Sequence, residues 1–200
     1  YGGHLVYLWA TEFPDLMKGI VSIAGSLDRW DVTKEKIELI EKPFSDCKNW
    51  NKGNFYGLDD KEIKDALIDY RINVLKHYGF EDFLKTKTND PEKIKSIILD
   101  QALGWANHFD PNSLIILRRA NYNSSALKKL ENIKIPILKV LAKTDKVTNM
   151  DKGYETVEYF KSLKIRYKFL ALHTDYGHYG PMCESNEWSE ELKKFLDNTI

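Results

Sequence analysis

The sequence predicts an α/β protein, with parallel strands flanked by helices and a helical segment inserted between two parts of the sheet. Three short apolar runs, at residues 19–26, 137–142 and 167–172, have the leucine-rich and β-branched composition of strands buried in a parallel sheet. Helical patterns follow the last two runs, and strand–helix alternation with short connections indicates right-handed crossovers. Residues 27–131 interrupt this alternation with mostly helical periodicity.

The first helix is expected over residues 2–13, where Leu5, Trp9 and Phe13 recur at helical spacing before Pro14 ends the pattern. This helix leads into the apolar run at residues 19–26. A helix that leads into such a strand is half of a βαβ unit whose first strand is not seen. We therefore expect the chain to begin in the middle of a fold.

The inserted segment contains three helical patterns. One covers residues 59–78, a second starts at Asp90-Pro91 and continues through Ala102, and a third covers 112–122, whereas residues 46–57 are loop-like. Further helices are expected over 150–163 and 188–196. The predicted organisation is therefore an α/β core at 1–26, a helical cap at 27–131 and the rest of the core at 132–200.

Composition excludes several classes of partner. Thirty basic and thirty acidic residues cancel, so no strong field favours nucleic acid or an anionic membrane. No apolar run reaches the roughly 18 residues that a membrane span requires. Cys47 and Cys183 form neither a disulfide framework nor a metal-ligand spacing, and two free thiols suit a reducing, cytoplasmic setting. We expect no cofactor. The composition is compatible with a monomer and with a homodimer.

His178 is the leading candidate for chemistry. It lies on a Gly-His-Tyr-Gly turn after the run at 167–172, so it is held in place and reachable, as general acid–base catalysis requires. Asp145 follows the run at 137–142 and is its expected partner. The alternatives are an ordinary loop histidine and a turn aspartate, because Thr-Asp-Lys is favourable turn chemistry. Asp175 is a competing acid on the His178 loop itself.

The remaining candidates carry weaker signals. A metal pair of His173 and His178 lacks a neighbouring carboxylate or cysteine pattern, so no metal is expected. Trp9 and Trp105 are expected as core aromatics. None of the candidate serines lies in a Gly-x-Ser-x-Gly context, and these are Ser26, Ser113, Ser124 and Ser125.

Four motifs occur in order along nearly the whole chain. They are Tyr1-Gly2-Gly3-His4 with Phe13-Pro14-Asp15, Trp105-Ala106-Asn107-His108-Phe109-Asp110-Pro111-Asn112-Ser113, Ile133-Lys134-Ile135-Pro136 with Asp145, and Tyr176-Gly177-His178. Together they resemble the α/β-hydrolase fold, and within it the homoserine O-acetyltransferase-like group. The order nucleophile, Asp, His agrees with that fold.

The resemblance implies a serine acyl-transfer enzyme, a hydrolase or an O-acyltransferase, that acts on a small-molecule acyl substrate. In that group the nucleophilic serine lies on a strained turn directly before the helix. The nucleophile would then immediately precede Tyr1 and be missing from this chain, and the Tyr1 N–H would be an oxyanion-hole donor. Asp145 and His178 would complete the triad.

The resemblance also implies substrate contacts. Arg71 lies roughly where the group carries an arginine that binds the substrate carboxylate, although a plain surface arginine is the alternative. His108 would line the cap side of the pocket. Tyr179 stands where the group has an aspartate that binds the substrate amine, which argues against homoserine itself. The competing interpretation of the whole chain is a truncated, non-catalytic binding protein.

Overall fold

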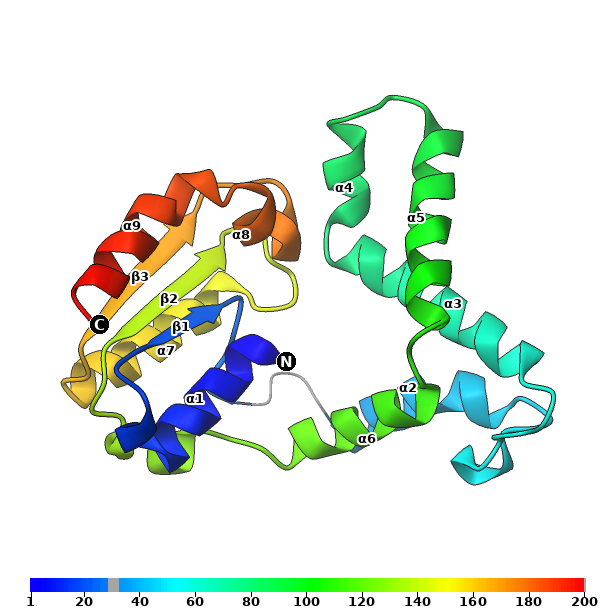
Figure 1. The fold of residues 1–200 in the computed structure, drawn as a ribbon, viewed down its shortest axis with the longest axis horizontal. Coiled ribbons are helices and arrows are strands. Elements are labelled where there is room, and N and C mark those ends of the chain that lie inside the picture. Colours follow the sequence, from blue (N-terminus) through cyan, green and yellow to red (C-terminus); the bar gives the residue numbers. More distant parts are fainter. Residues whose placement is uncertain (29–32, 200) are drawn as a thin grey trace. The chain divides into compact units, whose positions relative to one another are not determined.

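The computed structural model describes residues 1–28 and 33–199. The chain divides into two units. Tyr1–Trp30 together with Ser125–Ile200 form an α/β unit, and Asp31–Ser124 form a helical unit (Figure 1).

The α/β unit is built on a three-stranded parallel sheet in the order β1-β2-β3. Strand β2 (Ile137–Ala142) is central and buried along its whole length, as its apolar run predicts. Strand β3 (Tyr167–Leu172) also has the predicted bounds. Strand β1 (Ile20–Ile23) is shorter than predicted, because Ala24 has a φ of 49° and turns the chain out of extended conformation.

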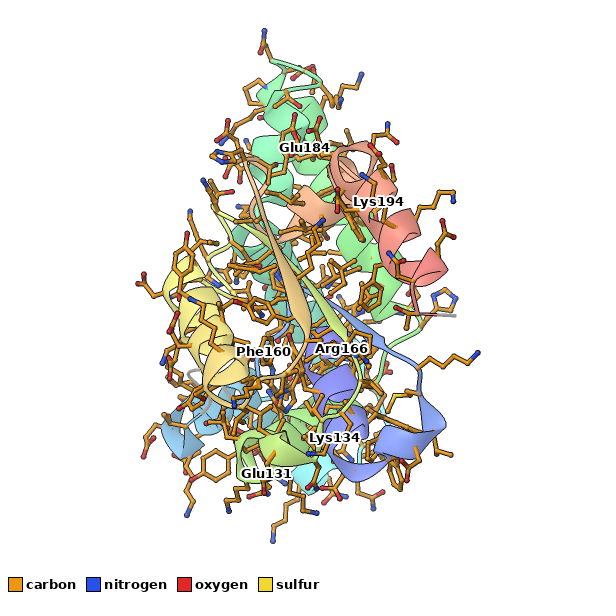
Figure 2. The ribbon with its side chains drawn as sticks, turned by 90° about the vertical axis from the view of Figure 1, so that its left-hand side faces the viewer. Glu131, Lys134, Phe160, Arg166, Glu184 and Lys194 are labelled. Atoms are coloured by element: carbon orange, nitrogen blue, oxygen red, sulfur yellow. The ribbon has the colours of Figure 1, made fainter. Side chains whose placement is uncertain are left out.

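Helices cover both faces of this sheet. Helices α1 (Gly2–Glu12) and α7 (Met150–Ser162) share one hydrophobic core with Ile137. Helix α9 (Asn186–Asp197) covers the other face, where Trp188 packs against Leu138 and Val140 (Figure 1). Figure 2 shows Phe160 on the α7 side of the strands. This is the α/β arrangement that the strand and helix patterns predict.

Helix α1 approaches the end of β1 so closely that only glycines fit. A Cβ atom on Gly25 would overlap the carbonyl of Gly3, and one on Gly3 would lie 2.7 Å from the Cα of Gly25. The Ser22 hydroxyl donates a 2.8 Å hydrogen bond to the same Gly3 carbonyl. These two glycines and this hydrogen bond therefore determine where the first turn of α1 lies relative to the sheet.

The helical unit surrounds an aromatic core. Phe44 and Trp50 have ring centroids 5.7 Å apart, and Trp50 stacks on Phe55 at 5.4 Å. Asp90 and Asp110 cap two of its helices through side-chain bonds to backbone N–H groups. The helices are α2 (Lys34–Ser45), α3 (Lys61–His77), α4 (Phe80–Lys85), α5 (Pro91–Ala106) and α6 (Pro111–Tyr122).

Two features of this unit differ from the sequence-based expectation. Helices α2 and α4 are additional to the three predicted patterns, because α2 is rich in charge and α4 has only six residues. The unit is also narrower than the predicted segment 27–131, because Leu27, Ala126 and Leu130 lie in the core of the α/β unit.

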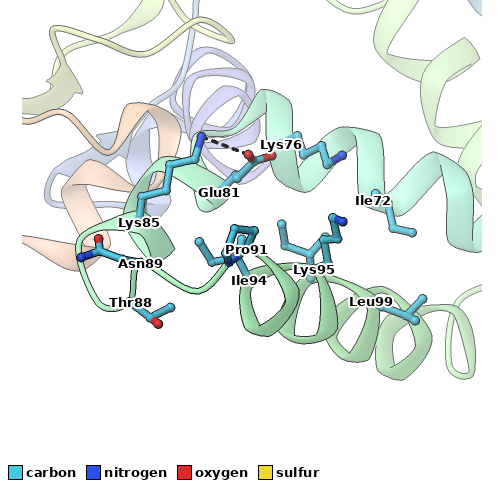
Figure 3. Close-up of a pocket in the computed structure, with 11 residues that line it drawn as sticks. Ile72, Lys76, Glu81, Lys85, Thr88, Asn89, Pro91, Ile94, Lys95 and Leu99 are labelled. Carbon is cyan, nitrogen blue, oxygen red and sulfur yellow. Dashed lines mark ion pairs between the residues drawn. The ribbon is translucent and has the colours of Figure 1, made fainter.

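A pocket of about 670 Å³ lies between α3, α4 and α5 (Figure 3). Its floor is apolar, with Ile94 and Ile98, and an ion pair of 3.0 Å between Lys85 and Glu81 lies at its edge. Its lining contains none of the residues that the sequence singled out for chemistry. Nowhere in residues 1–28 and 33–199 is there a helix long and apolar enough to span a membrane.

Candidate active site

Asp145 lies on the turn that follows β2, at the carboxyl end of the sheet. Its side chain is fully buried. The Oδ1 atom accepts hydrogen bonds from the backbone N–H groups of Val147, at 2.7 Å, and Thr148, at 3.0 Å. The Thr148 hydroxyl in turn donates to the carbonyl of Ala24 at 2.9 Å. The carboxylate is therefore held rigidly. Its Oδ1 atom makes the contacts expected of a turn residue, which was the alternative interpretation of Asp145, and its second oxygen is left for another partner.

The other oxygen of Asp145 contacts His178. The Nδ1 atom of His178 lies 2.9 Å from Oδ2 of Asp145. His178 sits in a single 3₁₀ turn, Gly177–Tyr179, which follows β3, and Gly177 has a φ of 55°, in the region that glycine adopts without strain. The His178 side chain is 26% exposed. The carboxyl ends of β2 and β3 thus bring together the two residues that the sequence paired.

This arrangement can perform acid–base chemistry. A buried carboxylate that accepts from Nδ1–H fixes the tautomer in which Nε2 is the basic nitrogen. The same carboxylate stabilises the imidazolium that forms when Nε2 takes up a proton. Because Asp145 is already held by two backbone N–H groups and by His178, it needs no reorganisation during the transfer.

Tyr1 lies at the amino end of α1, next to the Gly3–Gly25 contact. Its carbonyl accepts from the N–H groups of His4, at 2.9 Å, and Leu5, at 3.0 Å, so the first turn of α1 is formed. The Nδ1 atom of His4 lies 2.8 Å from the carbonyl of Ser26. His4 is therefore a buried anchor between the helix and the loop that follows β1.

The other predicted residues lie in varied settings. Tyr179 follows His178 on the same 3₁₀ turn and is half-buried. Arg71 and His108 belong to the helical unit: the Arg71 guanidinium lies 5.0 Å from the centre of the Trp105 ring, and His108 Nδ1 lies 2.9 Å from the carbonyl of Gly104. Asp175, the competing acid, is exposed.

The sequence-based interpretation missed Lys139, a fully buried lysine in the centre of β2. Burial lowers the pKa of Lys139 to about 8, and the negative charge of Asp145 partly opposes this shift. The sequence signal that could have indicated this buried lysine is a single lysine within the apolar run at 137–142. Within the described residues, no group of three or more His, Cys, Asp or Glu side chains could hold a metal ion.

Comparisons with curated proteins find homoserine O-acetyltransferases. The chain is 25% identical to that of Methanohalobium evestigatum, over 99% of the chain and 44% of that protein. It is 21% identical to that of Haemophilus influenzae, over 98% of the chain and 59% of that protein. No protein-family model matches. The chain thus spans only about half the length of these relatives.

Solved structures show the same fold. Esterase E22 superposes with a TM-score of 0.78 at 18% identity, over 98% of this chain and 58% of that one. A homoserine O-acetyltransferase from Bacillus anthracis superposes with a TM-score of 0.75 at 16% identity, over 100% of this chain and 58% of that one. The predicted resemblance is confirmed: the chain has a partial α/β-hydrolase fold and is similar along its whole length to the homoserine O-acetyltransferase-like group.

Proposed function

We propose that the chain is the C-terminal part of a serine acyl-transfer enzyme, an ester or thioester hydrolase or an O-acyltransferase. The observation that carries this proposal is the contact of 2.9 Å between His178 and the buried carboxylate of Asp145 at the carboxyl end of a parallel sheet. In the α/β-hydrolase fold the acid and the histidine of the triad follow the nucleophile in this chain order, which supports the proposal.

The reaction would proceed in two halves. The hydroxyl oxygen of a serine attacks the acyl carbonyl carbon, and Nε2 of His178 takes the hydroxyl proton. The tetrahedral intermediate collapses, the leaving group accepts that proton, and an acyl-serine remains. Water or an acceptor alcohol then gives its proton to His178 and attacks the acyl carbon. The second tetrahedral intermediate collapses, His178 returns the proton to the serine oxygen, and the product leaves. Asp145 holds the imidazole throughout.

In this proposal the nucleophile lies immediately before Tyr1. Two surface features support an additional upstream segment. Leu5, Trp9 and Phe13 form an exposed apolar row along α1 and its C-cap, with about half of each residue accessible, so the expectation that Trp9 is a core aromatic was wrong. Among the described residues β1 pairs only with β2, so its second edge can take another parallel strand. A preceding strand that ends in the serine would cover both.

The remaining roles follow from the same mechanism. The Tyr1 N–H would donate to the oxyanion from the amino end of α1, where the helix dipole also favours negative charge. The helical unit would act as the cap that selects the substrate and excludes water, which favours transfer over hydrolysis.

Three residues are proposed to contact the acyl substrate. The Arg71 Nε atom is buried without a hydrogen-bond partner in the described part of the chain, which suits a carboxylate ligand. His108 and Tyr179 are proposed as further contacts of the substrate. We propose a small-molecule substrate, no resident cofactor, and a monomer or homodimer.

The competing proposal is a non-catalytic binding protein. Its support is the set of serines within the chain: Ser26 donates to the carbonyl of Asp28 at 2.8 Å and is buried, and none lies in a nucleophile turn. Expression of the 200-residue chain separates the two proposals. Aggregation through the open strand edge favours a fragment, whereas a monomer with a cooperative melt favours a self-sufficient binding domain.

The direct test uses the protein extended upstream of Tyr1 by its own reading frame. Hydrolysis of p-nitrophenyl acetate and transfer from acetyl-CoA to small alcohols would be measured for the wild type, His178→Ala and His173→Ala. We expect loss of about 10⁴-fold or more in kcat for His178→Ala. His173→Ala is the matched control, because His173 lies on the same loop, outside the Asp145–His178 pair. Equal rates for wild type and His178→Ala reject the proposal.

A further inference from the structure

Lys139 is a charged side chain in the interior of the sheet. It lies in the middle of β2, paired in register with Ser22 of β1 and Phe169 of β3, and it is 0% exposed. A buried ammonium is costly unless it is hydrogen-bonded. Its Nζ atom donates to the carbonyl of Gly25 at 2.6 Å and lies 5.7 Å from the centre of the Tyr7 ring.

Two titratable groups face this ammonium. Tyr7, on α1, is fully buried, and its desolvation raises the pKa of the phenol, so the ring is neutral at physiological pH. Asp145, on the turn after β2, is the negative group whose field raises the pKa of Lys139. The strand neighbours contribute the Ser22 hydroxyl and the Phe169 ring, neither of which titrates. Lys139 is therefore coupled electrically to the acid of the candidate site.

The hydrogen bond to Gly25 couples Lys139 mechanically to α1. Gly25 lies against Gly3 of the first helical turn with no room for a Cβ atom between them. The Gly3 carbonyl also accepts from Ser22, the strand neighbour of Lys139. A shift of the Gly25 carbonyl would therefore move the amino end of α1 relative to the turn that carries Asp145.

We propose that Lys139 is a positioning residue whose buried ammonium holds Gly25, and through it the first turn of α1, in register with the Asp145–His178 pair. The inference rests on the proposed acyl-transfer function, in which that turn follows the nucleophile and supplies an oxyanion donor. A charged donor makes a stronger bond than a neutral amine. Deprotonation of Lys139 therefore weakens this bond and loosens the first turn of α1 locally, while it removes the cost of the buried charge for the fold as a whole. Turnover accordingly falls on the alkaline side.

The test compares Lys139→Met with the matched control Lys143→Met in the upstream-extended protein. Lys143 is exposed at the end of the same strand. Rates are expressed per active site, counted by titration with a fluorophosphonate. We expect Lys139→Met to lower kcat by roughly 10²-fold, as misplacement near 1 Å does, with KM changed less than about twofold. Lys143→Met retains wild-type values.

The pH profile separates positioning from mere stability. The wild-type kcat should fall with an apparent pKa near 8, and this alkaline limb should be absent in Lys139→Met. If Lys139→Met melts earlier but keeps the wild-type kcat and alkaline limb, Lys139 is only structural and the proposal is overturned. If Lys139→Met does not fold, the pH profile of the wild type is the test. A wild-type kcat that does not fall near pH 8 overturns the proposal.

An activity-independent measurement distinguishes failure of this inference from failure of the proposed function. The N–H groups of His4 and Leu5 bond the Tyr1 carbonyl at 2.9 and 3.0 Å, and their hydrogen exchange reports the first turn of α1. We expect exchange at both to accelerate at least about tenfold in Lys139→Met and to stay unchanged in Lys143→Met. If the wild type is inactive but shows this exchange pattern, the acyl-transfer function is rejected and the positioning role of Lys139 is retained. If exchange is the same in Lys139→Met and the wild type, the positioning role is rejected.

Discussion

The contact between Gly3 and Gly25 predicts a large loss of stability when either glycine gains a side chain. In Gly25→Ala the new methyl group would overlap the Gly3 carbonyl and would lie 2.5 Å from the Ser22 Oγ atom. Both contacts are far shorter than van der Waals separation, so the first turn of α1 must move away from β1.

The magnitude follows from the groups that move. Overpacking costs about 1–3 kcal/mol. The displacement also weakens two hydrogen bonds, from Ser22 to Gly3 and from Lys139 to Gly25, at about 1 kcal/mol each. The sum is about 3–5 kcal/mol. Each kcal/mol lowers the melting temperature of a protein of about 150–250 residues by about 2–4 °C, and that of the longer, upstream-extended protein by less, so a decrease of at least about 5 °C is expected.

The assay is thermal unfolding of the upstream-extended protein, followed by circular dichroism. Gly104→Ala, in helix α5, is the matched control, because Gly104 is exposed, a Cβ atom on it would meet nothing within 4 Å, and alanine favours the helix by up to about 1 kcal/mol. A melting temperature for Gly25→Ala within about 2 °C of the wild type would refute the close approach of α1 to β1.

Two further predictions concern stability. Because the pKa of Lys139 is about 8 in the folded protein and 10.5 for an ordinary, solvated lysine, the unfolded chain binds more protons between these pH values, so the free energy of unfolding rises across that window. Urea titration should show a gain of up to roughly 3 kcal/mol for wild type relative to Lys139→Met, and a flat difference would contradict the buried charge. Asp90 accepts from the N–H groups of Glu92 and Lys93 at 3.0 and 3.2 Å, so Asp90→Ala should destabilise α5 by about 1 kcal/mol, measured by hydrogen exchange, with no change in α1.

Much of the sheet could be predicted because its signals are local. Two strands, at 137–142 and 167–172, have the predicted bounds, since both are mainly apolar runs. Strand β2 is buried along its whole length as predicted, whereas β3 is only partly buried. The pairing of Asp145 with His178 was also predictable, because the carboxyl ends of neighbouring parallel strands share one edge of the sheet.

Other features depend on tertiary contacts that the sequence does not display. The importance of Gly3 and Gly25 lies in their mutual approach, which is visible only when α1 is packed on β1. Lys139 looks like a solvated lysine until the strand is placed at the centre of the sheet. Helix α2 was missed because its sequence is charged and contains Pro43, and its Thr33 cap is a weak signal.

The nucleophile is tested most directly by covalent labelling of the upstream-extended protein with a fluorophosphonate, followed by mass spectrometry of the modified peptide. We expect one adduct, on a serine immediately before Tyr1, and its loss in His178→Ala, because the serine needs His178 as its base. An upstream neighbour that is not a nucleophile, or an adduct that forms equally well without His178, would rule out the serine acyl-transfer mechanism and favour the non-catalytic binding protein.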